Sequence, residues 1–517
     1  MLNQKAFCQA GDLDSTFGNN GIVVPFLNGN GNATDIAVQQ DGKILVCGYS
    51  GVDGFTVIRL NESGTPDSSF GYNGISTTVV GGGNNLDGKI AIQSDGKIVV
   101  AGNCATFDGY WSCALLRLNA DGMLDNTFGI GGKVVYSLMD PHQYFNSCRE
   151  IAIGPDQKIT TAVITNTLPN NQVFGVARFT SSGVFDNTFG WNGIALTPIG
   201  NAYAAATSIR IQPDGKTVVG GGSYSPTDQS FAIARYNVNG TLDNSFNGDG
   251  MDTLYFYNPD TYDGNSIGYD FFIQPNGMIV ISGNTSVSNS TIGHIAIARY
   301  TTAGNLDNSF GTGGKKILQV PGYPIVNAFS VTGQADSKIV IAGCCSPSTT
   351  NFKLTTMVVR IFQDGSLDTG FGVNGIATFD VDSMPDAYIL SVGMDQQQRI
   401  VGAGYSYELG FMALRYLSGL EVGIIDLAID QLPVLFYPNP VKSEAIIRYT
   451  ITDDYNITIS LYDMLGREVQ KLFNEVPQLK GMHTMKLLFN PSLPSGEYLL
   501  AISDGRNSQG IRLIIQR

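Results

Sequence analysis

The sequence predicts an all-β protein: a seven-bladed β-propeller of four-stranded blades followed by a small C-terminal β-sandwich. Three observations favour this fold. A six-residue motif, Leu-Asp-x-x-Phe-Gly, recurs seven times at intervals of 53 to 64 residues. The intervals hold short apolar segments without the spacing of an amphipathic helix. The 517 residues include 63 Gly, 27 Phe and 23 Tyr but only 14% charged residues, which suits short strands and tight turns.

We call each copy of the motif a hook. The hooks begin at Leu13, Pro66, Leu124, Phe185, Leu242, Leu306 and Leu367, with departures from the consensus at Pro66, Phe185 and Asn247. The first unit has apolar segments at 22–24, 36–38, 44–47 and 55–60. We therefore expect four strands per unit, counting the segment after the hook as the first. Such units bury their faces only against neighbours, as in a propeller. A right-handed β-solenoid is the alternative.

A tight hairpin turn separates the second and third segments of each unit. It reads Asp-Gly or Asn-Gly at 41–42, 95–96, 214–215 and 276–277, where both residues tolerate positive φ. The third segment carries a small residue at one recurring position, which fits close packing between blades. These residues are Cys47, Ala101, Ala162, Gly220, Ser282, Ala342 and Ala403.

An Arg near the end of the fourth segment precedes the hook Asp by eight residues in six units. The pairs are Arg59 and Asp67, Arg117 and Asp125, Arg178 and Asp186, Arg235 and Asp243, Arg299 and Asp307, and Arg360 and Asp368. Arg415 lacks a following Asp and Asp14 lacks a preceding Arg, so the two would meet in a closed ring. We expect Asp14 and Phe17 to complete the junction between blades seven and one, with the chain cut in a connection and not inside a blade.

The repeated Arg and Asp side chains have two interpretations. They could form ligand or calcium sites, but active sites are seldom replicated around a ring. We interpret them as ion-pair braces, in which the Asp also accepts turn N–H groups and the hook Phe fills the gap between blades. Loss of one Asp is then expected to lower stability and not activity.

The spacing predicts one uniform and one variable face. The hooks and hairpins keep constant lengths, whereas the connections from hook to hairpin and from hairpin to Arg vary. In an antiparallel blade both variable connections leave the same face, which we call the variable face; the other is the hairpin face. Loops on a rigid scaffold commonly carry function, so we expect the variable face to bind a glycan or a protein.

Three aromatic-rich loops mark this candidate surface, at 106–111, 138–146 and 254–265. Tyr and Trp side chains can stack on sugars or anchor a protein partner, although such side chains can also pack back onto the blades. The candidate residues are Tyr110, Trp111, Tyr144, Tyr255, Tyr257, Tyr262 and Asp263.

Catalytic motifs are sparse. The three His residues are His142, His294 and His483, and no HExxH, paired CxxC or G-x-S-x-G motif occurs. We expect no catalytic residue, cofactor or metal site, and a non-catalytic binding module is the first hypothesis. A lyase or glycosidase is the alternative, using carboxylates among Asp140, Asp260, Asp263, Asp382 and Asp386.

Cysteine spacing, net charge, hydropathy and the N-terminal residues add four expectations. Cys104 and Cys113 flank a loop between adjacent strands and suggest a disulfide worth about 2 kcal/mol. The net charge of −14 argues against a nucleic-acid partner. No run of 18 apolar residues predicts a transmembrane segment. Residues 1–11 are interpreted as the remnant of a signal peptide or as an N-terminal tail.

The repeat pattern, assigned to 12–416, is followed by a linker at 417–433 and by alternating strands that predict a β-sandwich at 434–517. This last segment resembles the type A C-terminal sorting domain of type IX secretion substrates. The resemblance is carried by Pro438, Asn439, Pro440, Gly466, Gly481, Gly496 and Tyr498. It implies recognition by the type IX machinery and its sortase, and export across the outer membrane for release or anchoring at the cell surface. The propeller units resemble the delta-60 repeat, which implies a fold but no activity.

Overall fold

The computed structural model contains two compact units, 1–419 and 420–517. It describes residues 10–25, 31–50, 54–140, 146–168, 171–200, 203–225, 229–256, 265–286, 293–350, 353–380, 386–420, 435–438, 441–451, 453–463, 467–503 and 508–516. All regular elements in these ranges are strands, and no membrane-spanning helix occurs among them. The all-β prediction is confirmed.

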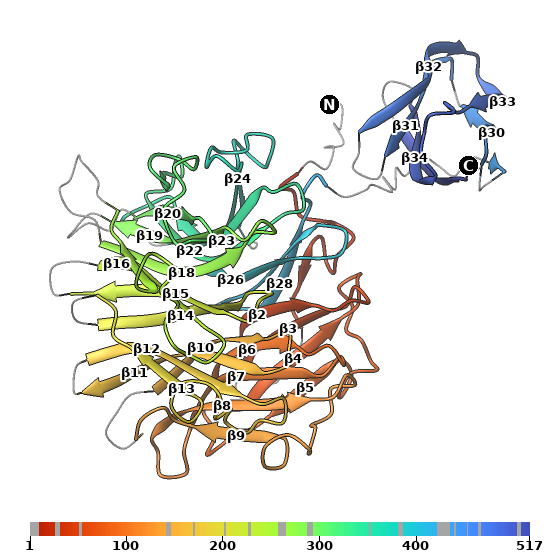
Figure 1. The fold of residues 1–517 in the computed structure, drawn as a ribbon. Helices are drawn as coiled ribbons and strands as arrows, with labels where there is room; N and C mark the ends of the chain where they lie inside the picture. The colour runs from red at the N-terminus through yellow and green to blue at the C-terminus, as the bar shows by residue number, and fades with distance from the viewer. Residues whose placement is uncertain are drawn as a thin grey trace. The chain divides into compact units, whose positions relative to one another are not determined.

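The first unit forms seven antiparallel sheets of four strands, as predicted (Figure 1). Six blades use consecutive strands, listed here in chain order: β2 (Asn32–Val38), β3 (Ile44–Ser50), β4 (Gly54–Leu60), β5 (Ile75–Thr78); β6 (Leu86–Ile92), β7 (Ile98–Ala105), β8 (Trp111–Leu118), β9 (Lys133–Tyr136); β10 (Asn146–Ile153), β11 (Ile159–Leu168), β12 (Asn171–Phe179), β13 (Ile194–Thr197); β14 (Tyr203–Ile211), β15 (Thr217–Tyr224), β16 (Gln229–Tyr236), β17 (Met251–Leu254); β18 (Asn265–Ile273), β19 (Ile279–Ser286), β20 (Gly293–Tyr300), β21 (Lys315–Leu318); β22 (Ile325–Gly333), β23 (Ile339–Ser346), β24 (Thr355–Ile361), β25 (Ile376–Phe379).

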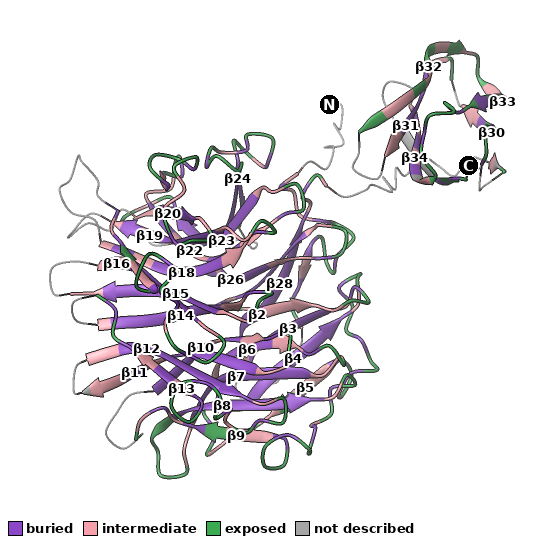
Figure 2. Ribbon diagram, in the orientation of Figure 1, coloured by how far each residue is buried: buried purple, intermediate pink, exposed green. Residues whose placement is uncertain are grey.

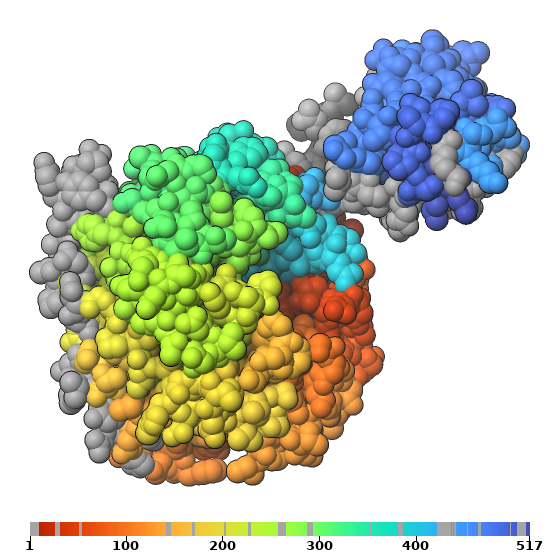
Figure 3. Space-filling model, in the orientation of Figure 1, coloured from red at the N-terminus to blue at the C-terminus, as the bar shows by residue number. Residues whose placement is uncertain are grey.

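The seventh blade joins the two ends of the propeller. It combines β26 (Ala387–Met394), β27 (Ile400–Ser406) and β28 (Gly410–Tyr416) with the N-terminal β1 (Ile22–Val23), which pairs with β28. The N-terminal residues and blade seven meet directly on the surface in Figure 3, where red adjoins cyan. The expectation that the chain is cut in a connection is therefore wrong, because the cut lies inside blade seven.

The hook explains this correction. It does not lead into a new blade; it reverses the chain between the third and fourth strands of one blade. The N–H of Asp67 donates to the carbonyl of Arg59 at 2.8 Å, and the N–H of Arg59 donates to the carbonyl of Gly74 at 2.9 Å. Gly74 has a φ of 92° and an added Cβ would lie 2.8 Å from the Pro66 Cβ, so glycine is required at the reversal. The segment after each hook is thus the outermost strand of the preceding sheet.

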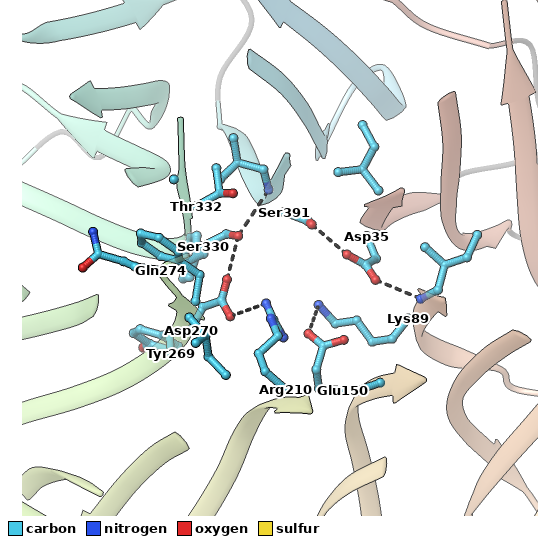
Figure 4. Close-up of a pocket in the computed structure, with 18 of the residues that line it drawn as sticks. Asp35, Lys89, Glu150, Arg210, Tyr269, Asp270, Gln274, Ser330, Thr332 and Ser391 are labelled. Atoms are coloured by element: carbon cyan, nitrogen blue, oxygen red, sulfur yellow. Dashed lines mark hydrogen bonds and ion pairs between the residues drawn. The ribbon is translucent and has the colours of Figure 1, made fainter. Parts of the chain in front are cut away.

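The first strand of every blade contains a β-bulge near its middle. In β2, for example, the pairing with β3 shifts between Ala33 and Asp35. Just before the bulge, a carbonyl of the first strand approaches the second strand closely: a Cβ on Gly48 would meet the Asn32 carbonyl oxygen at 1.9 Å. Glycine follows the small residue of the second strand in six blades for this reason, and Val163 takes its place in the third blade. In each blade the bulge turns the side chain of the residue that follows it, such as Asp35 in β2 and Lys89 in β6, toward the propeller axis (Figure 4).

The core lies between neighbouring blades, where strand faces are buried on both sides (Figure 2). All seven hook Phe side chains are fully buried there: Phe17, Phe70, Phe128, Phe189, Phe246, Phe310 and Phe371. The topology also places the hairpins and hooks on one face, and the second-to-third strand loops and blade-to-blade connections on the other. The distinction between hairpin face and variable face follows from this strand order.

The second unit is a two-sheet sandwich around a separate apolar core. One sheet contains β29 (Leu435–Tyr437), β30 (Glu444–Ile451) and β33 (Gly481–Leu488). The other contains β32 (Glu468–Gln478), β31 (Tyr455–Asp463), β34 (Gly496–Ser503) and β35 (Ser508–Ile515).

Candidate functional site

The repeated Arg and Asp side chains form one contact in every blade. The Nε of each Arg donates to Oδ2 of its Asp at 2.7 to 2.8 Å, in the pairs Arg59–Asp67, Arg117–Asp125, Arg178–Asp186, Arg235–Asp243, Arg299–Asp307, Arg360–Asp368 and Arg415–Asp14. The other Asp oxygen accepts the N–H of the residue two positions later, as from Ser69 to Asp67 at 3.0 Å. The pair joins the third strand of a blade to its hook.

The guanidinium also reaches the next blade. Arg235 Nη1 donates to the carbonyl of Thr302, one blade further on, at 2.6 Å. Each guanidinium lies over the ring of its hook Phe, with 4.4 to 5.0 Å from Cζ to the ring centroid. Every contact is internal to the ring of blades, so we interpret the pairs as braces.

The sequence analysis missed a third member of the brace, the Lys of the Asp-Gly-Lys hairpin. Lys43 Nζ lies 2.9 Å from Asp67 Oδ2, and Lys97, Lys158, Lys216 and Lys338 repeat the contact at 2.9 to 3.3 Å. Burial raises the pKa of Asp67, but hydrogen bonds from Lys43 and Ser69 and the charge of Arg59 outweigh it and hold the pKa well below 3.8. The sequence signal for this contact is the recurrence of Lys two residues after the hairpin Asp, with Gly between them in three of the five blades.

A second set of equivalent positions differs in chemistry from blade to blade. It consists of the residue after each bulge, paired with the small residue of the second strand: Asp35, Lys89, Glu150, Ser208, Asp270, Ser330 and Ser391. We call these seven residues the axial ring. Sequence reasoning missed the ring because a bulge shifts the alternation of side chains by one residue. The dipeptide of a small residue and Gly on the second strand was the available signal.

The axial ring links successive blades by hydrogen bonds (Figure 4). Asp35 accepts the N–H of Ile90 at 2.8 Å and the hydroxyl of Ser391 at 2.7 Å. The N–H of Val392 donates to Ser330 Oγ at 3.2 Å. Blades one and two, seven and one, and six and seven are thereby joined near the axis.

Asp270 is the most heavily hydrogen-bonded carboxylate of the ring. Its Oδ1 accepts hydrogen bonds from Ser208 Oγ at 2.7 Å, Arg210 Nη2 at 2.9 Å and the Phe271 N–H at 2.8 Å. Its Oδ2 accepts from Ser330 Oγ at 2.9 Å and the Val331 N–H at 3.1 Å. Five donors from three neighbouring blades fix the position of this carboxylate.

Glu150 has a different environment. Its Oε1 accepts the N–H of Ile151 at 3.0 Å, and Lys89 Nζ lies 3.8 Å from Oε2. Burial raises the pKa of Glu150 to about 7, with further contributions from Asp35 and Asp270 and opposing ones from Lys89 and Arg210. Glu150 is thus a ring carboxylate that can change protonation near neutral pH.

Six members of the axial ring, all except Ser208, line a cavity of about 780 Å³. Lys89, Glu150 and Arg210 line one part of it, and Tyr269, Phe272 and Phe329 line another. Gln274, Pro275, Gln334 and Ser337 belong to the hairpins, so the cavity extends toward the hairpin face. The sequence predicted a binding site on the variable face, whereas this cavity extends toward the hairpin face.

The predicted binding residues lie in different settings. Tyr110 and Trp111 are 40% and 39% exposed beside Phe107, which is 93% exposed, and Tyr255 is half-buried. Tyr144, Tyr257, Tyr262 and Asp263 lie outside the described residues. The sequence analysis missed a Tyr cluster on blade seven, in which the Tyr388 and Tyr405 rings stack at 4.9 Å and Tyr407 meets both edge-on.

The disulfide between Cys104 and Cys113 is not formed, and this prediction is wrong. Cys113 pairs across the strands with Asn103, and Cys104 pairs with Ser112. The two side chains therefore point to opposite faces of the sheet, into different hydrophobic clusters. All six described cysteines are free thiols.

Four of the remaining titratable candidates lie within the described residues. His294 lies on β20, where burial lowers its pKa, and His483 lies in the sandwich. Asp386 accepts the N–H of Leu354 at 2.9 Å. Asp140 is exposed, whereas His142, Asp260, Asp263 and Asp382 lie outside the described residues.

The sandwich residues singled out from sequence are placed in part. Gly481 and Gly496 begin β33 and β34, and the Tyr498 hydroxyl donates to the Pro494 carbonyl at 2.9 Å. Pro438 is exposed. Asn439, Pro440 and Gly466 lie outside the described residues.

Comparisons with known families identify both units. Segments 39–70, 93–128, 212–246, 274–310 and 334–371 match the family described as "Domain of unknown function (DUF5122) beta-propeller". Residues 435–516 match the "Secretion system C-terminal sorting domain", which indicates export across the outer membrane, to the cell surface or into the medium. The chain matches no curated protein.

Solved structures that resemble the chain have low sequence identity. PorZ, a surface component of the type IX secretion system of Porphyromonas gingivalis, is 9% identical with a TM-score of 0.25, over 97% of this chain and 82% of that one. A PL25 ulvan lyase bound to a GlcA–Rha3S unit is 10% identical with a TM-score of 0.44, over 80% and 98%. A protein of unknown function from Dyadobacter fermentans is 12% identical with a TM-score of 0.36, over 69% and 95%. With TM-scores this low, none of them carries a functional argument.

Proposed function

We propose that this protein, a chain of DUF5122 beta-propeller repeats that ends in a type IX sorting domain, is a non-catalytic binding module of the cell surface or the secreted fraction. A signal peptide would carry it across the inner membrane, and the secretion machinery and its sortase would recognise 434–517. The propeller would then bind a glycan or a protein.

The single observation that carries the binding role is that hydrogen bonds within the protein engage the axial carboxylates Asp270 and Asp35. Asp270 accepts five hydrogen bonds and Asp35 accepts two. Hydrolysis by a glycosidase needs two carboxyl groups that exchange protons or attack the sugar. Glu150 is the remaining carboxyl group of the axial ring that could exchange protons or attack a sugar. One such group is too few for this mechanism, so the ring favours binding over catalysis.

The axial cavity is the part of the propeller best suited to a specific ligand. Identical side chains at equivalent positions, such as the braces, serve the repeated architecture. The axial ring instead places acidic, basic and hydroxyl side chains at one structural position. Groups that differ around a closed ring distinguish one orientation of a ligand from another.

Binding without turnover is tested with the full chain. A glycan array and a cell-surface binding screen identify ligands, and an assay for new reducing ends and unsaturated products follows each hit. We expect binding with no product, weakened about tenfold by Arg210→Met, because one charged donor is lost. A hit that is unaffected by this variant, with Arg448→Met in the sandwich as control, contradicts the role of the cavity.

A carbohydrate-active enzyme is the second candidate, and Glu150 is the observation that favours it. A carboxyl with a pKa of about 7 suits a general acid or base. Product formation that disappears in Glu150→Gln, while ligand binding is retained, would establish the enzyme and refute the binding module.

The variable face is a separate candidate surface, with Phe107, Tyr110 and Trp111 exposed. The chain has two Trp residues, so Trp191→Phe leaves Trp111 as the single fluorescent reporter. Quenching of Trp111 by a ligand, lost on Phe107→Ala but kept in Arg210→Met, would place binding on this face instead.

A further inference from the structure

The axial cavity holds two cations with unused hydrogen-bonding capacity. Lys89 has three N–H donors, and within the described residues its one hydrogen-bond acceptor is the Thr34 carbonyl, at 3.2 Å. Arg210 divides its donors among the Ile209 carbonyl, Ser208 Oγ and Asp270 Oδ1 at 2.8 to 3.2 Å, through Nη1 and Nη2. Both side chains retain N–H groups for a ligand.

Lys89 and Arg210 come from different blades but surround the same acidic group. They are carried by β6 and β14, and Glu150 on the intervening β10 interacts electrostatically with both. Figure 4 shows the three side chains directed toward the centre of the ring. Two cations that converge on one point from separate rigid blades form a preorganised anion site.

The part of the cavity next to Arg210, on blades five and six, is aromatic. Tyr269, Phe272 and Phe329 lie on β18 and β22, and the Tyr269 and Phe329 rings meet edge to face with centroids 5.5 Å apart. The apolar face of a sugar ring packs against such rings, while its hydroxyls need polar partners such as Thr332 and Ser337. A cavity of about 780 Å³ lies in the ordinary range for small-molecule sites.

We propose that the axial cavity binds an acidic saccharide, with a carboxylate or sulfate group between Lys89 and Arg210 and the sugar ring against Tyr269 and Phe329. This inference rests on the proposed binding function and names its ligand class. It identifies a chemistry shared by uronic acids and sulfated sugars.

Glu150 makes the affinity dependent on pH. Ionised Glu150 competes with the ligand for Lys89 and Arg210, and Asp35 and Asp270 face the same space with further negative charge. Protonation of Glu150 near pH 7 removes the competing charge. An anionic ligand therefore binds more tightly below this pH than above it, whereas a neutral sugar shows no such dependence.

The experiment compares three probes by titration calorimetry with the full chain at pH 6. They are a glucuronate-containing disaccharide, its methyl ester, and an otherwise uncharged disaccharide that carries one sulfate group. We expect the glucuronate or the sulfate form to bind about tenfold more tightly than the ester, because each adds charge-assisted hydrogen bonds. The arms with carboxylate and sulfate distinguish the two sources of charge.

Variants locate the effect. Lys89→Met and Arg210→Met are each expected to weaken the anionic probe about tenfold and the ester less than about twofold. Lys133→Met on the outer strand β9 is the matched control. Thermal unfolding reports on folding, and a double variant, Lys89→Met with Glu150→Gln, removes both charges together if the single variant fails to fold. Glu150→Gln should abolish the difference in affinity between pH 6 and pH 8.

The outcomes separate this inference from the proposed function. Equal affinity for all three probes, reduced alike by the cavity variants, keeps the binding function and overturns the anionic class. Anion binding that neither cavity variant changes overturns the site. No binding of any probe or array glycan, with a protein partner found in the cell-surface screen, overturns both the saccharide class and a glycan-binding function.

Discussion

Arg415 Nε donates a hydrogen bond to Asp14 Oδ2 over 2.7 Å, although the two residues lie 401 positions apart. Arg399 Nη1 also lies 3.5 Å from the same oxygen. The contact fastens the N-terminal hook to the last blade, beside the pairing of β1 with β28. The ring therefore closes by a strand and by a brace.

Asp14→Ala should destabilise the propeller. It removes the carboxylate that accepts the Nε hydrogen bond of Arg415, of which 1% is exposed, and leaves among the described residues only the longer ion pair with Asp395, at 3.9 Å. Removal of one partner of a buried ion pair costs about 3 kcal/mol. The measurement is the denaturation midpoint in urea. Asp364→Ala, at an exposed turn, is the control, and an equal loss in both variants would contradict the brace.

Met278→Lys should stabilise the propeller slightly. Blade five has Met278 where five other blades place the hairpin Lys, so Asp307 lacks that partner among the described residues. The new pair would be partly exposed, as Lys43 is, and should contribute at most about 1 kcal/mol. Thermal unfolding compares it with Met482→Lys in the sandwich, which gains no such partner, and a lower melting temperature than wild type would refute the expectation.

Glu150→Gln should remove part of the pH dependence of stability. Burial raises the pKa of Glu150 from 4.5 to about 7. The stability that a raised carboxyl pKa reflects is fully present below pH 4.5 and is lost as pH rises through about 7. Wild type should therefore lose stability between pH 5 and pH 8 more steeply than the variant. If the urea midpoints of the wild type and of Glu150→Gln changed equally between pH 5 and pH 8, Glu150 would be ionised throughout this range.

Thiol titration should find the six described cysteines reduced. Burial raises the pKa of the Cys104 thiol to about 11 and that of Cys113 well above its usual 9.0. We expect negligible reaction with a thiol reagent at pH 8 in the folded protein and full reaction in denaturant, with reductant removed beforehand. A deficit of two thiols in denaturant would restore a disulfide, which Cys113→Ser would then locate.

Local chemistry explains what could be predicted. The hook repeats because a buried Phe, a brace Asp and a reversing Gly are needed in every blade, so Phe70, Asp67 and Gly74 leave a periodic trace. The same periodicity predicts the pairing of Arg415 with Asp14 from the sequence alone. The predicted disulfide is wrong because Cys104 and Cys113 are not cross-strand partners, and successive residues of a strand point to opposite faces of the sheet.

The axial ring illustrates what the sequence could not provide. Asp35, Lys89 and Ser391 share no residue type. Each stands six residues before its hairpin turn, at Asp41, Asp95 and Gln397, but the linear pattern does not show that a bulge turns these side chains toward the axis. Only closure of the ring brings seven such positions around one axis.

By itself, the sequence determined the all-β class, the seven blades, the brace and the exported sandwich, because these depend on residues that must recur or that act locally. The tertiary structure decided that the chain is cut inside blade seven, that the Cys104 and Cys113 thiols face apart, and that Lys89, Glu150 and Arg210 converge on the axis. These features depend on which strands pair and where they bulge, and both are settled by contacts between segments far apart in the chain.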